Sequence, residues 1–222
     1  MSDLHVLRVF TDANGAYGNP LGVVLDGSSV EPDARQALAR RLGFSETVFV
    51  DDASTGTVCI FTPGRELPFA GHPLVGTGWL LASQGADLAA LHPPAGEVAT
   101  WSEGELRWIR GRADWVHDMH VVQLDSPAAI EALVAAPGDE SNTYVWAWDD
   151  ESSGAVRSRY FAGTLGIVED EATGAAAVVL TTRLGRPLEI RQGRGSRLSA
   201  RPGPDGTAEV GGRVVLDEVR PL

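Results

Sequence analysis

The chain has 222 residues, 18 basic side chains that are all arginine, 30 acidic side chains and a formal net charge of -12. Its 43% hydrophobic and 22% charged residues suit a packed globular protein and exclude a disordered chain. The acidic excess without a basic stripe excludes nucleic acid and anionic membrane surfaces as partners, and the absence of lysine excludes Schiff-base and P-loop enzymes.

The N-terminus, Met1 to Phe10, lacks a basic segment followed by an apolar one, and no stretch of about eighteen uninterrupted apolar residues follows. We therefore expect a cytoplasmic protein without a membrane segment. Strand-like runs rich in Val, Ile, Phe, Tyr and Trp alternate with Gly, Pro, Asn and Asp. Strands are predicted at 6–10, 21–25, 47–50, 57–61, 144–148, 157–161, 188–191 and 213–219.

Three stretches have helical patterns. Residues 32–42 predict a surface helix that ends at Gly43 as a C-cap. Residues 73–84 and 173–184 are apolar around most of the helix and rich in Gly or Ala, so both predict helices buried on all sides. The fold class predicted is α+β, with two similar halves that each wrap a curled, barrel-like sheet around one buried helix.

The segments that lead into the two buried helices, 60–72 and 160–172, share a plan of strand, turn, acid and glycine. This similarity indicates a weak internal duplication with a boundary near residues 95–105. We predict an N-terminal half at 1–100 and a C-terminal half at 101–222. Residues 137–154 are interpreted as polar loop on both sides of one strand.

The single cysteine, Cys59, excludes an internal disulfide and a zinc site of several thiolates. Its apolar neighbours favour a small core residue over a reactive thiol. His117 and His120 are three residues apart, but a zinc site would need further ligands besides these two histidines. A turn is the simpler interpretation of this segment. The glycines at 76–78 and 193–195 form no dinucleotide fingerprint. Asn19, before a proline, is interpreted as a turn residue although it could face a cleft.

Ser45 and Glu46 lead directly into an apolar strand, so Glu46 is expected at the edge of the core. Burial there would raise the pKa of its carboxyl group, as a general base working near neutral pH requires. A turn or capping role for the Ser-Glu pair fits the same pattern, and both interpretations stay open.

Gly71-His72-Pro73 opens the first buried helix, where free amides and the helix dipole favour anions and His72 adds a titratable group. A structural histidine is the alternative. Glu169, Asp170 and Glu171 precede the second buried helix. Because acids favour helix N-termini, at least two of these three need no further function.

The segments FSETVFV, IFTPGRELPFAGHPLVGT and GIVEDEATGAA resemble, in order and spacing, the signatures of the PhzF-like family. This family is named for the phenazine-biosynthesis isomerase and is related in fold to diaminopimelate epimerase. AYGNPLGVV near the start, and RQGRGSRLSA and VGGRVVL near the end, also look like strands of the family. The resemblance covers most of the chain outside residues 100–155.

The resemblance implies an active-site cleft between the two halves, where both buried helices begin. It implies that Glu46 is the catalytic glutamate and that His72 and Asp170 are the histidine and aspartate of the site. The same resemblance places the backbone amides that hold a substrate carboxylate at the two helix starts. The substrate-binding residues predicted are Ser45, Gly71, Gly174 and Ala175.

Two departures from the family concern the substrate. Ala175 stands where members often have serine, and the chain is short, with the missing residues in the 100–155 region. The opposed cysteine pair of diaminopimelate epimerase is absent, so a two-thiol racemase is excluded and a carboxylate must carry the proton.

The function predicted is a cofactor-independent isomerase that shifts a proton on a small unsaturated amino or carboxylic acid in secondary-metabolite biosynthesis. We expect neither metal nor cofactor, and a small molecule as the substrate. A catalytically silent protein that binds a small carboxylate is the alternative.

Self-association is predicted from five tryptophans, because the shortened second half is expected to be too small to bury them. Aromatic side chains left on a surface usually mark a contact, so we expect a homodimer. The five tryptophans are Trp101, Trp108, Trp115, Trp146 and Trp148.

Overall fold

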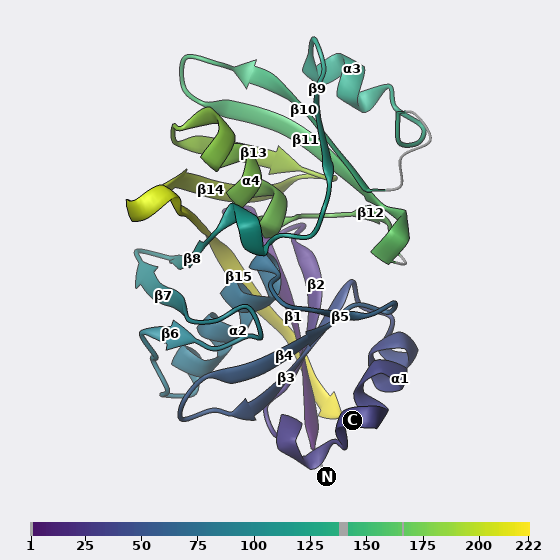
Figure 1. Cartoon of the computed structure of the whole chain (residues 1–222), viewed down its shortest axis with the longest axis vertical. Helices are drawn as coiled ribbons and strands as arrows, with labels where there is room; N and C mark the ends of the chain where they lie inside the picture. Colours follow the sequence, from purple (N-terminus) through teal and green to yellow (C-terminus); the bar gives the residue numbers. More distant parts are fainter. Residues whose placement is uncertain (1, 138–141, 166) are drawn as a thin grey trace.

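The computed structural model describes residues 2–137, 142–165 and 167–222. Over these residues the chain forms one branched sheet of fifteen strands and four α-helices (Figure 1), which is the α+β class expected. Residues 138–141 of the predicted polar loop lie outside the described part. Among the described residues, no helix is both long enough and apolar enough to span a membrane.

The described elements include all eight predicted strands and all three predicted helices, together with seven strands and one helix, α3, that were not predicted. In chain order, the first are β1 (Asp3–Thr11), β2 (Asn19–Val24), α1 (Pro32–Leu42), β3 (Glu46–Asp52), β4 (Thr57–Phe61), β5 (Glu66–Leu67) and α2 (Gly71–Ser83). The next are β6 (Ala90–Leu91), β7 (Val98–Glu103), β8 (Leu106–Gly111), β9 (His120–Gln123), α3 (Pro127–Glu131), β10 (Asn142–Asp150) and β11 (Ala155–Ala162). The last are β12 (Ile167–Asp170), α4 (Gly174–Leu184), β13 (Leu188–Gln192), β14 (Ser196–Pro202) and β15 (Ala208–Pro221).

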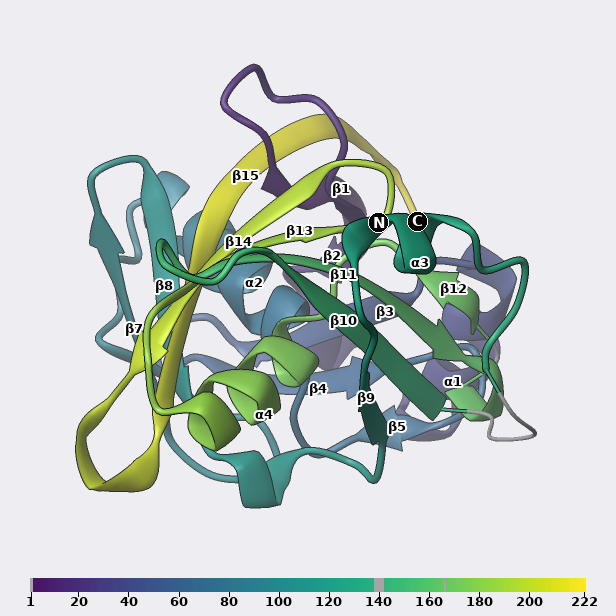
Figure 2. The ribbon, with the colours of Figure 1, turned by 90° about the horizontal axis from the view of Figure 1, so that it is seen from above.

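The long strand β15 lies in the middle of the sheet and links its two parts. Neighbouring strands follow the order β5-β4-β3-β2-β1-β15-β14-β13-β11-β10-β9. Residues 208–212 of β15 pair with β8, and 213–221 pair with β1, so the strand changes partner in its middle. Figure 2 shows β15 as a long curve across the molecule. The predicted boundary between residues 100 and 101 falls inside β7, and the division into halves stays a prediction.

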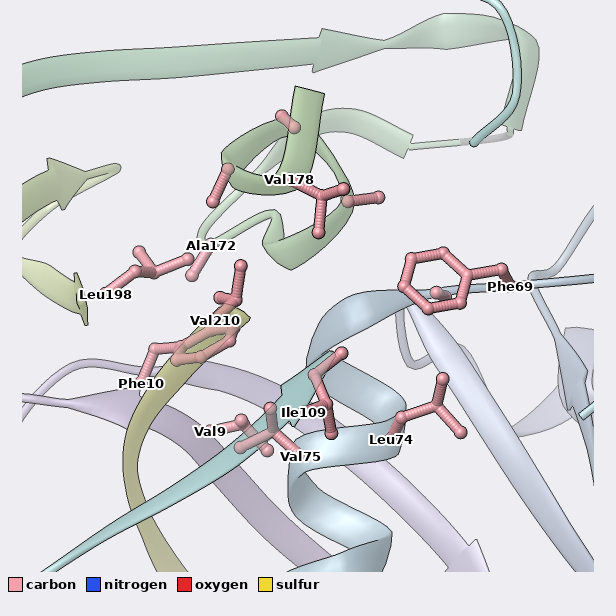
Figure 3. Packing of buried hydrophobic residues seen from close by; sticks show 14 of the residues in the cluster. Val9, Phe10, Phe69, Leu74, Val75, Ile109, Ala172, Val178, Leu198 and Val210 are labelled. Atoms are coloured by element: carbon pink, nitrogen blue, oxygen red, sulfur yellow. The ribbon is translucent and has the colours of Figure 1, made fainter. Parts of the chain in front are cut away.

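Helices α2 and α4 lie inside the curled sheet, as their all-round apolar pattern predicts. α2 packs on β1, β2, β3, β7, β8 and β15, and α4 packs on β14 and β15. Figure 3 shows Leu74 and Val75 of α2, Val178 of α4 and Val210 of β15 within one cluster of buried side chains. One continuous core therefore holds the two helices in fixed positions, and their N-termini meet (see below).

The expectation that five tryptophans lie on the surface is wrong. Trp108 and Trp146 are 5% exposed, and the other three are half-buried. Trp101 stacks on Trp108, Trp146 packs on Trp148, and Trp115 packs on Phe69. Arginine side chains lie over three of the five rings, as the Arg201 guanidinium does 4.3 Å from the Trp108 ring centre. Arginine stems thus cover aromatic surface that the shortened region could not bury. The homodimer loses this support and stays a prediction.

Cys59 lies on β4 as predicted and is half-buried. Its Sγ is 3.6 Å from Asp51 Oδ2. Burial, with the nearby negative charge of Asp51, raises the pKa of the thiol to about 11. A thiol that stays protonated near neutral pH is a poor nucleophile, which fits the predicted packing role.

Candidate active site

A small enclosed pocket lies where α2 and α4 begin. Its volume is about 10 Å³, room for about one water molecule. Three of its wall residues are the predicted catalytic residues Glu46, His72 and Asp170. The other residues that line it are Leu67, Phe69, Ala70, Gly71, His117, Tyr160, Leu165, Ile167, Thr173, Gly174 and Ala175.

Glu46 is the first residue of β3. This strand runs parallel to β2, and Glu46 is the partner of Leu21 at the start of the pairing. The residue is 5% exposed, and its Oε2 atom has no hydrogen-bond partner among the described residues. His72 Nε2 lies 3.5 Å from Glu46 Oε2 and likewise has no hydrogen-bond partner among the described residues. Leaving two buried polar atoms without hydrogen bonds lowers the stability of the fold. Such unsatisfied groups are typical of a binding or catalytic site.

Burial shifts the pKa values of all three groups. Burial, reinforced by the negative charge of Asp170, raises the pKa of Glu46 well above its ordinary value, against a hydrogen bond from Ser45. Burial also raises the pKa of Asp170 to about 6, although hydrogen bonds from Thr173 and Asn19 act in the opposite direction. Burial lowers the pKa of His72 to about 3, so the imidazole is neutral near pH 7. The site therefore combines a carboxyl group poised to exchange a proton with an uncharged histidine.

Asn19 links the three parts of the site. Its Nδ2 donates to Asp170 Oδ1 at 2.7 Å and to the Ala172 carbonyl at 2.8 Å. The same nitrogen is 3.4 Å from His72 Nδ1. Its Oδ1 accepts a hydrogen bond of 3.0 Å from Ser45 Oγ. Asn19 is 2% exposed, so it is a buried connector and not merely the predicted turn residue.

The other oxygen of Asp170 is also held. Thr173 Oγ1 donates to Asp170 Oδ2 at 2.6 Å, and Gln192 Nε2 donates to Thr173 Oγ1 at 2.8 Å. Gln192 Oε1 accepts from the Thr173 amide at 3.1 Å. Asp170 is thereby fixed in one orientation by residues of β2, the α4 start and β13, which suits a positioning group better than a mobile base.

Both helix starts leave their amides available. Neither Ala70 before α2 nor Thr173 before α4 forms a side-chain cap, and neither first turn contains an acid. The first amides of a helix have no carbonyl partner inside it and carry the positive end of its dipole. Two such ends in one pocket wall favour an anionic group such as a carboxylate.

The two helix starts touch backbone to backbone at Gly71 and Gly174. A Cβ built on Gly71 would lie 2.6 Å from the Gly174 carbonyl carbon, and one built on Gly174 would lie 2.9 Å from the Gly71 carbonyl carbon. Only glycine permits this approach. The resemblance placed these two glycines in the site, and the structure gives a steric reason for both.

The remaining predicted residues lie at the edge of the pocket or serve other roles. Ala175 lines the pocket, whereas Ser45 faces an adjoining open groove and donates to Asn19. Glu169 forms a two-pronged ion pair with Arg159, and Glu171 accepts from the Arg194 amide and the Ser196 hydroxyl. Two of the three acids before α4 thus have structural partners, but these partners are arginine and serine groups of other segments and not the helix terminus on which the prediction rested.

Five polar residues of the pocket or its hydrogen-bond network were not predicted as site residues: Asn19, His117, Tyr160, Thr173 and Gln192. His117 comes from the His-Asp-Met-His motif, where the sequence favoured a turn, and its Nε2 is 2.8 Å from Tyr160 OH. Over the residues that the structure describes, no group of three or more His, Cys, Asp or Glu is arranged to hold a metal ion. For His117, the sequence signal that could have been used was a histidine within the 100–155 region, where the resemblance to the family is otherwise lost.

The raised pKa of Glu46 predicts an effect on stability. A carboxyl group whose pKa is raised on folding stabilises the folded state below its unfolded pKa, and this contribution is lost as pH rises through the folded pKa. In measurements from about pH 5 to about pH 8, we expect Glu46→Gln to become progressively more stable than the parent until the folded pKa of Glu46 is passed, by up to about 1.4 kcal/mol per pH unit. Urea unfolding of both proteins at each pH measures the difference.

The comparison cancels the titration of groups that do not interact with Glu46, because the parent and the variant share them. Asp170 interacts with Glu46 through its charge, so its titration contributes to the measured difference. Glu209→Gln is the matched control. Burial acts to raise the pKa of Glu209, but hydrogen bonds from Arg201 and Arg110 outweigh it and the pKa is lowered. This control is expected to be less stable than the parent at neutral pH. A constant difference between parent and Glu46→Gln across the range would contradict the buried-carboxyl assignment.

The chain is similar to known proteins in sequence. A family model described as "Phenazine biosynthesis-like protein" matches residues 7–107. Trans-2,3-dihydro-3-hydroxyanthranilate isomerase of Pseudomonas fluorescens is 31% identical over an alignment of 223 positions, which covers 79% of this chain and 80% of the relative.

Solved structures are similar over the whole chain. A predicted epimerase from Pseudomonas aeruginosa has 26% identity and a TM-score of 0.74, covering 100% of this chain and 99% of that one. A putative phenazine-biosynthesis protein from Clostridium difficile has a TM-score of 0.80 with the same coverage, and its 17% identity concerns the fold alone. With 31% identity to a named isomerase across four fifths of its length, the chain belongs to the PhzF-like family of phenazine-biosynthesis isomerases and is an isomerase.

Proposed function

We propose that this isomerase moves a proton on a small unsaturated amino or carboxylic acid, without a cofactor, in secondary-metabolite biosynthesis. Its site lies between two similar halves built around α2 and α4. Glu46 removes a proton from a carbon acidified by a neighbouring double bond or carboxylate and returns it to another carbon on the same face. His72 and Asp170 orient the substrate, and the amides at Gly71, Gly174 and Ala175 bind its carboxylate.

The observation that carries this proposal is the state of Glu46. Its Oε2 is buried and without a hydrogen bond, it faces a neutral His72 at 3.5 Å, and it shares a pocket with two uncapped helix starts. A base with a raised pKa can take up a proton and release it near neutral pH. An anion held by the helix starts would bring its acidic carbon into the same small pocket.

The name of a curated relative supports the proposed substrate class. The curated relative acts, by its name, on trans-2,3-dihydro-3-hydroxyanthranilate, a ring with a carboxylate, an amino group and a hydroxyl group. We propose a substrate of this class for the present chain. Ala175 supplies an amide but no hydroxyl, so the carboxylate is held by backbone groups to a greater extent than in members with serine.

Isotope transfer tests the single-base path. Trans-2,3-dihydro-3-hydroxyanthranilate with ordinary hydrogen is incubated with the protein in deuterated water, and the product is analysed by NMR before one turnover is complete. Because one enclosed carboxyl group carries the proton, part of the substrate's own hydrogen should appear at the new carbon. Complete replacement by deuterium would argue against transfer within an enclosed site.

Two further results separate the alternatives. Binding of the compound without any turnover would show a silent binding protein and would overturn the catalytic proposal. His72→Asn is the companion variant, because His72 is the nearest group that could pass the proton to solvent. If retention of the original hydrogen rises in this variant while isomerisation continues, His72 is the exchange route and its purely orienting role is wrong.

A further inference from the structure

A second polar pair lines the same pocket and has no part in the mechanism above. Tyr160 of β11 is directly opposite Asp170 of β12, and on its other side it is opposite Tyr144 of β10. Residues opposite each other in antiparallel strands project from the same face of the sheet. The register therefore places the Tyr160 side chain beside Asp170, and Tyr160 lines the pocket while Tyr144 does not.

His117 reaches Tyr160 from the segment between β8 and β9. Trp115, two residues earlier, packs against the pocket residue Phe69 with ring centres 5.8 Å apart, which anchors the segment. His117 Nε2 lies 2.8 Å from Tyr160 OH. The Nδ1 atom of the same ring is buried and has no hydrogen-bond partner among the described residues.

The hydrogen-bonding capacity of this pair is incomplete whichever atom is the donor. Burial and the charge of Arg65 lower the pKa of His117, so its ring carries one N–H. If Tyr160 donates to His117, its oxygen keeps a free acceptor position. If His117 donates to Tyr160, the hydroxyl hydrogen is free. A hydroxyl group on a ligand could complete either arrangement, since it both donates and accepts.

We propose that Tyr160 and His117 form a specificity dyad, in which Tyr160, oriented by His117, hydrogen-bonds an oxygen substituent of the substrate other than its carboxylate. The inference rests on the proposed function, which gives the pocket a substrate with a carboxylate at the helix starts. It adds that a ring hydroxyl is recognised from the wall formed by β11.

Two aromatic analogues of the proposed substrate class test the dyad. 3-Hydroxyanthranilate and anthranilate differ by the hydroxyl group alone, and calorimetry under nitrogen gives the dissociation constant of each. For the parent protein we expect the hydroxylated compound to bind about 3- to 10-fold more tightly, as one neutral hydrogen bond allows. This ratio should fall to about 1 in Tyr160→Phe and should also fall in His117→Phe.

Tyr144→Phe is the matched control, because it removes a buried tyrosine hydroxyl from the same row of side chains without changing the pocket wall. It should keep the ratio of the parent. Equal affinity of the parent for both compounds, or an equal loss for both in Tyr160→Phe, would overturn the dyad and leave the carboxylate site standing. Failure of the parent to bind either compound would overturn the proposed substrate class together with the dyad.

Discussion

Glu46→Gln is expected to lower kcat by about two to four orders of magnitude, the usual contribution of a positioned general base. Glutamine keeps the size and shape of the side chain but cannot take up a proton. The buried position of Glu46, without a hydrogen bond at Oε2, gives no structural reason for the variant to unfold. Steady-state assays with trans-2,3-dihydro-3-hydroxyanthranilate, together with a melting curve, measure both properties.

Glu209→Gln serves again as the control, because Glu209 is a buried glutamate of β15 that pairs with Arg110 and Arg201 and does not line the pocket. It should keep most of the parent kcat despite some loss of stability. A Glu46→Gln protein that turned over substrate at the parent rate would return Glu46 to the turn or capping role that its sequence also allows.

Gly71→Ala should damage both stability and activity. The new methyl group would lie 2.6 to 2.8 Å from the backbone of Gly174 and Ala175, atoms that cannot move aside as a flexible side chain can. Overpacking of this kind costs about 1–3 kcal/mol. Because the two helix starts would be forced apart, kcat/KM should also fall by about 100-fold, as expected for a displacement of about 1 Å in a site.

Gly64→Ala is the matched control on the same approach to α2. Gly64 is exposed, and its nearest neighbour to a new Cβ would be the Leu165 carbonyl oxygen at 3.4 Å, an ordinary contact. This variant should melt and react like the parent. If Gly71→Ala did the same, the close contact of the helix starts would be unnecessary for the site.

Three of the four described α-helices and eight of the fifteen described strands could be predicted from local pattern. The Pro32–Leu42 helix was predicted with its correct ends, because a proline begins it and a glycine with φ of 74° ends it. The hairpin of β7 and β8 was not predicted. Its inward face contains Arg107, which is 1% exposed and bonded to Thr100 and Asp87, so the alternation of apolar and polar residues is interrupted there.

Burial of the tryptophans depends on contacts that no local pattern contains. Trp101 and Trp108 face each other across that hairpin, and the arginines over their rings come from β8 and β14. A count of aromatic residues against the length of the region therefore overestimated the exposed surface.

The residues of the site show the same contrast between local sequence pattern and contacts with distant segments. Glu46, His72 and Asp170 stand next to helix and strand starts, so sequence context identified them as candidates. Asn19 and Tyr160 were missed because their importance depends on strand partners far along the chain: Asn19 bonds to Asp170, and Tyr160 is opposite it in the sheet.

The enclosed pocket also sets how any ligand must bind. A volume of about 10 Å³ cannot admit a six-membered ring, so binding has to begin from a wider conformation of the protein. If only a fraction of molecules is wide at any time, the apparent affinity is reduced by that fraction. Stopped-flow measurements would then give an observed rate that levels off or declines as ligand concentration rises. The affinity of a ligand that enters this pocket would then contain the free energy of widening as well as that of contact.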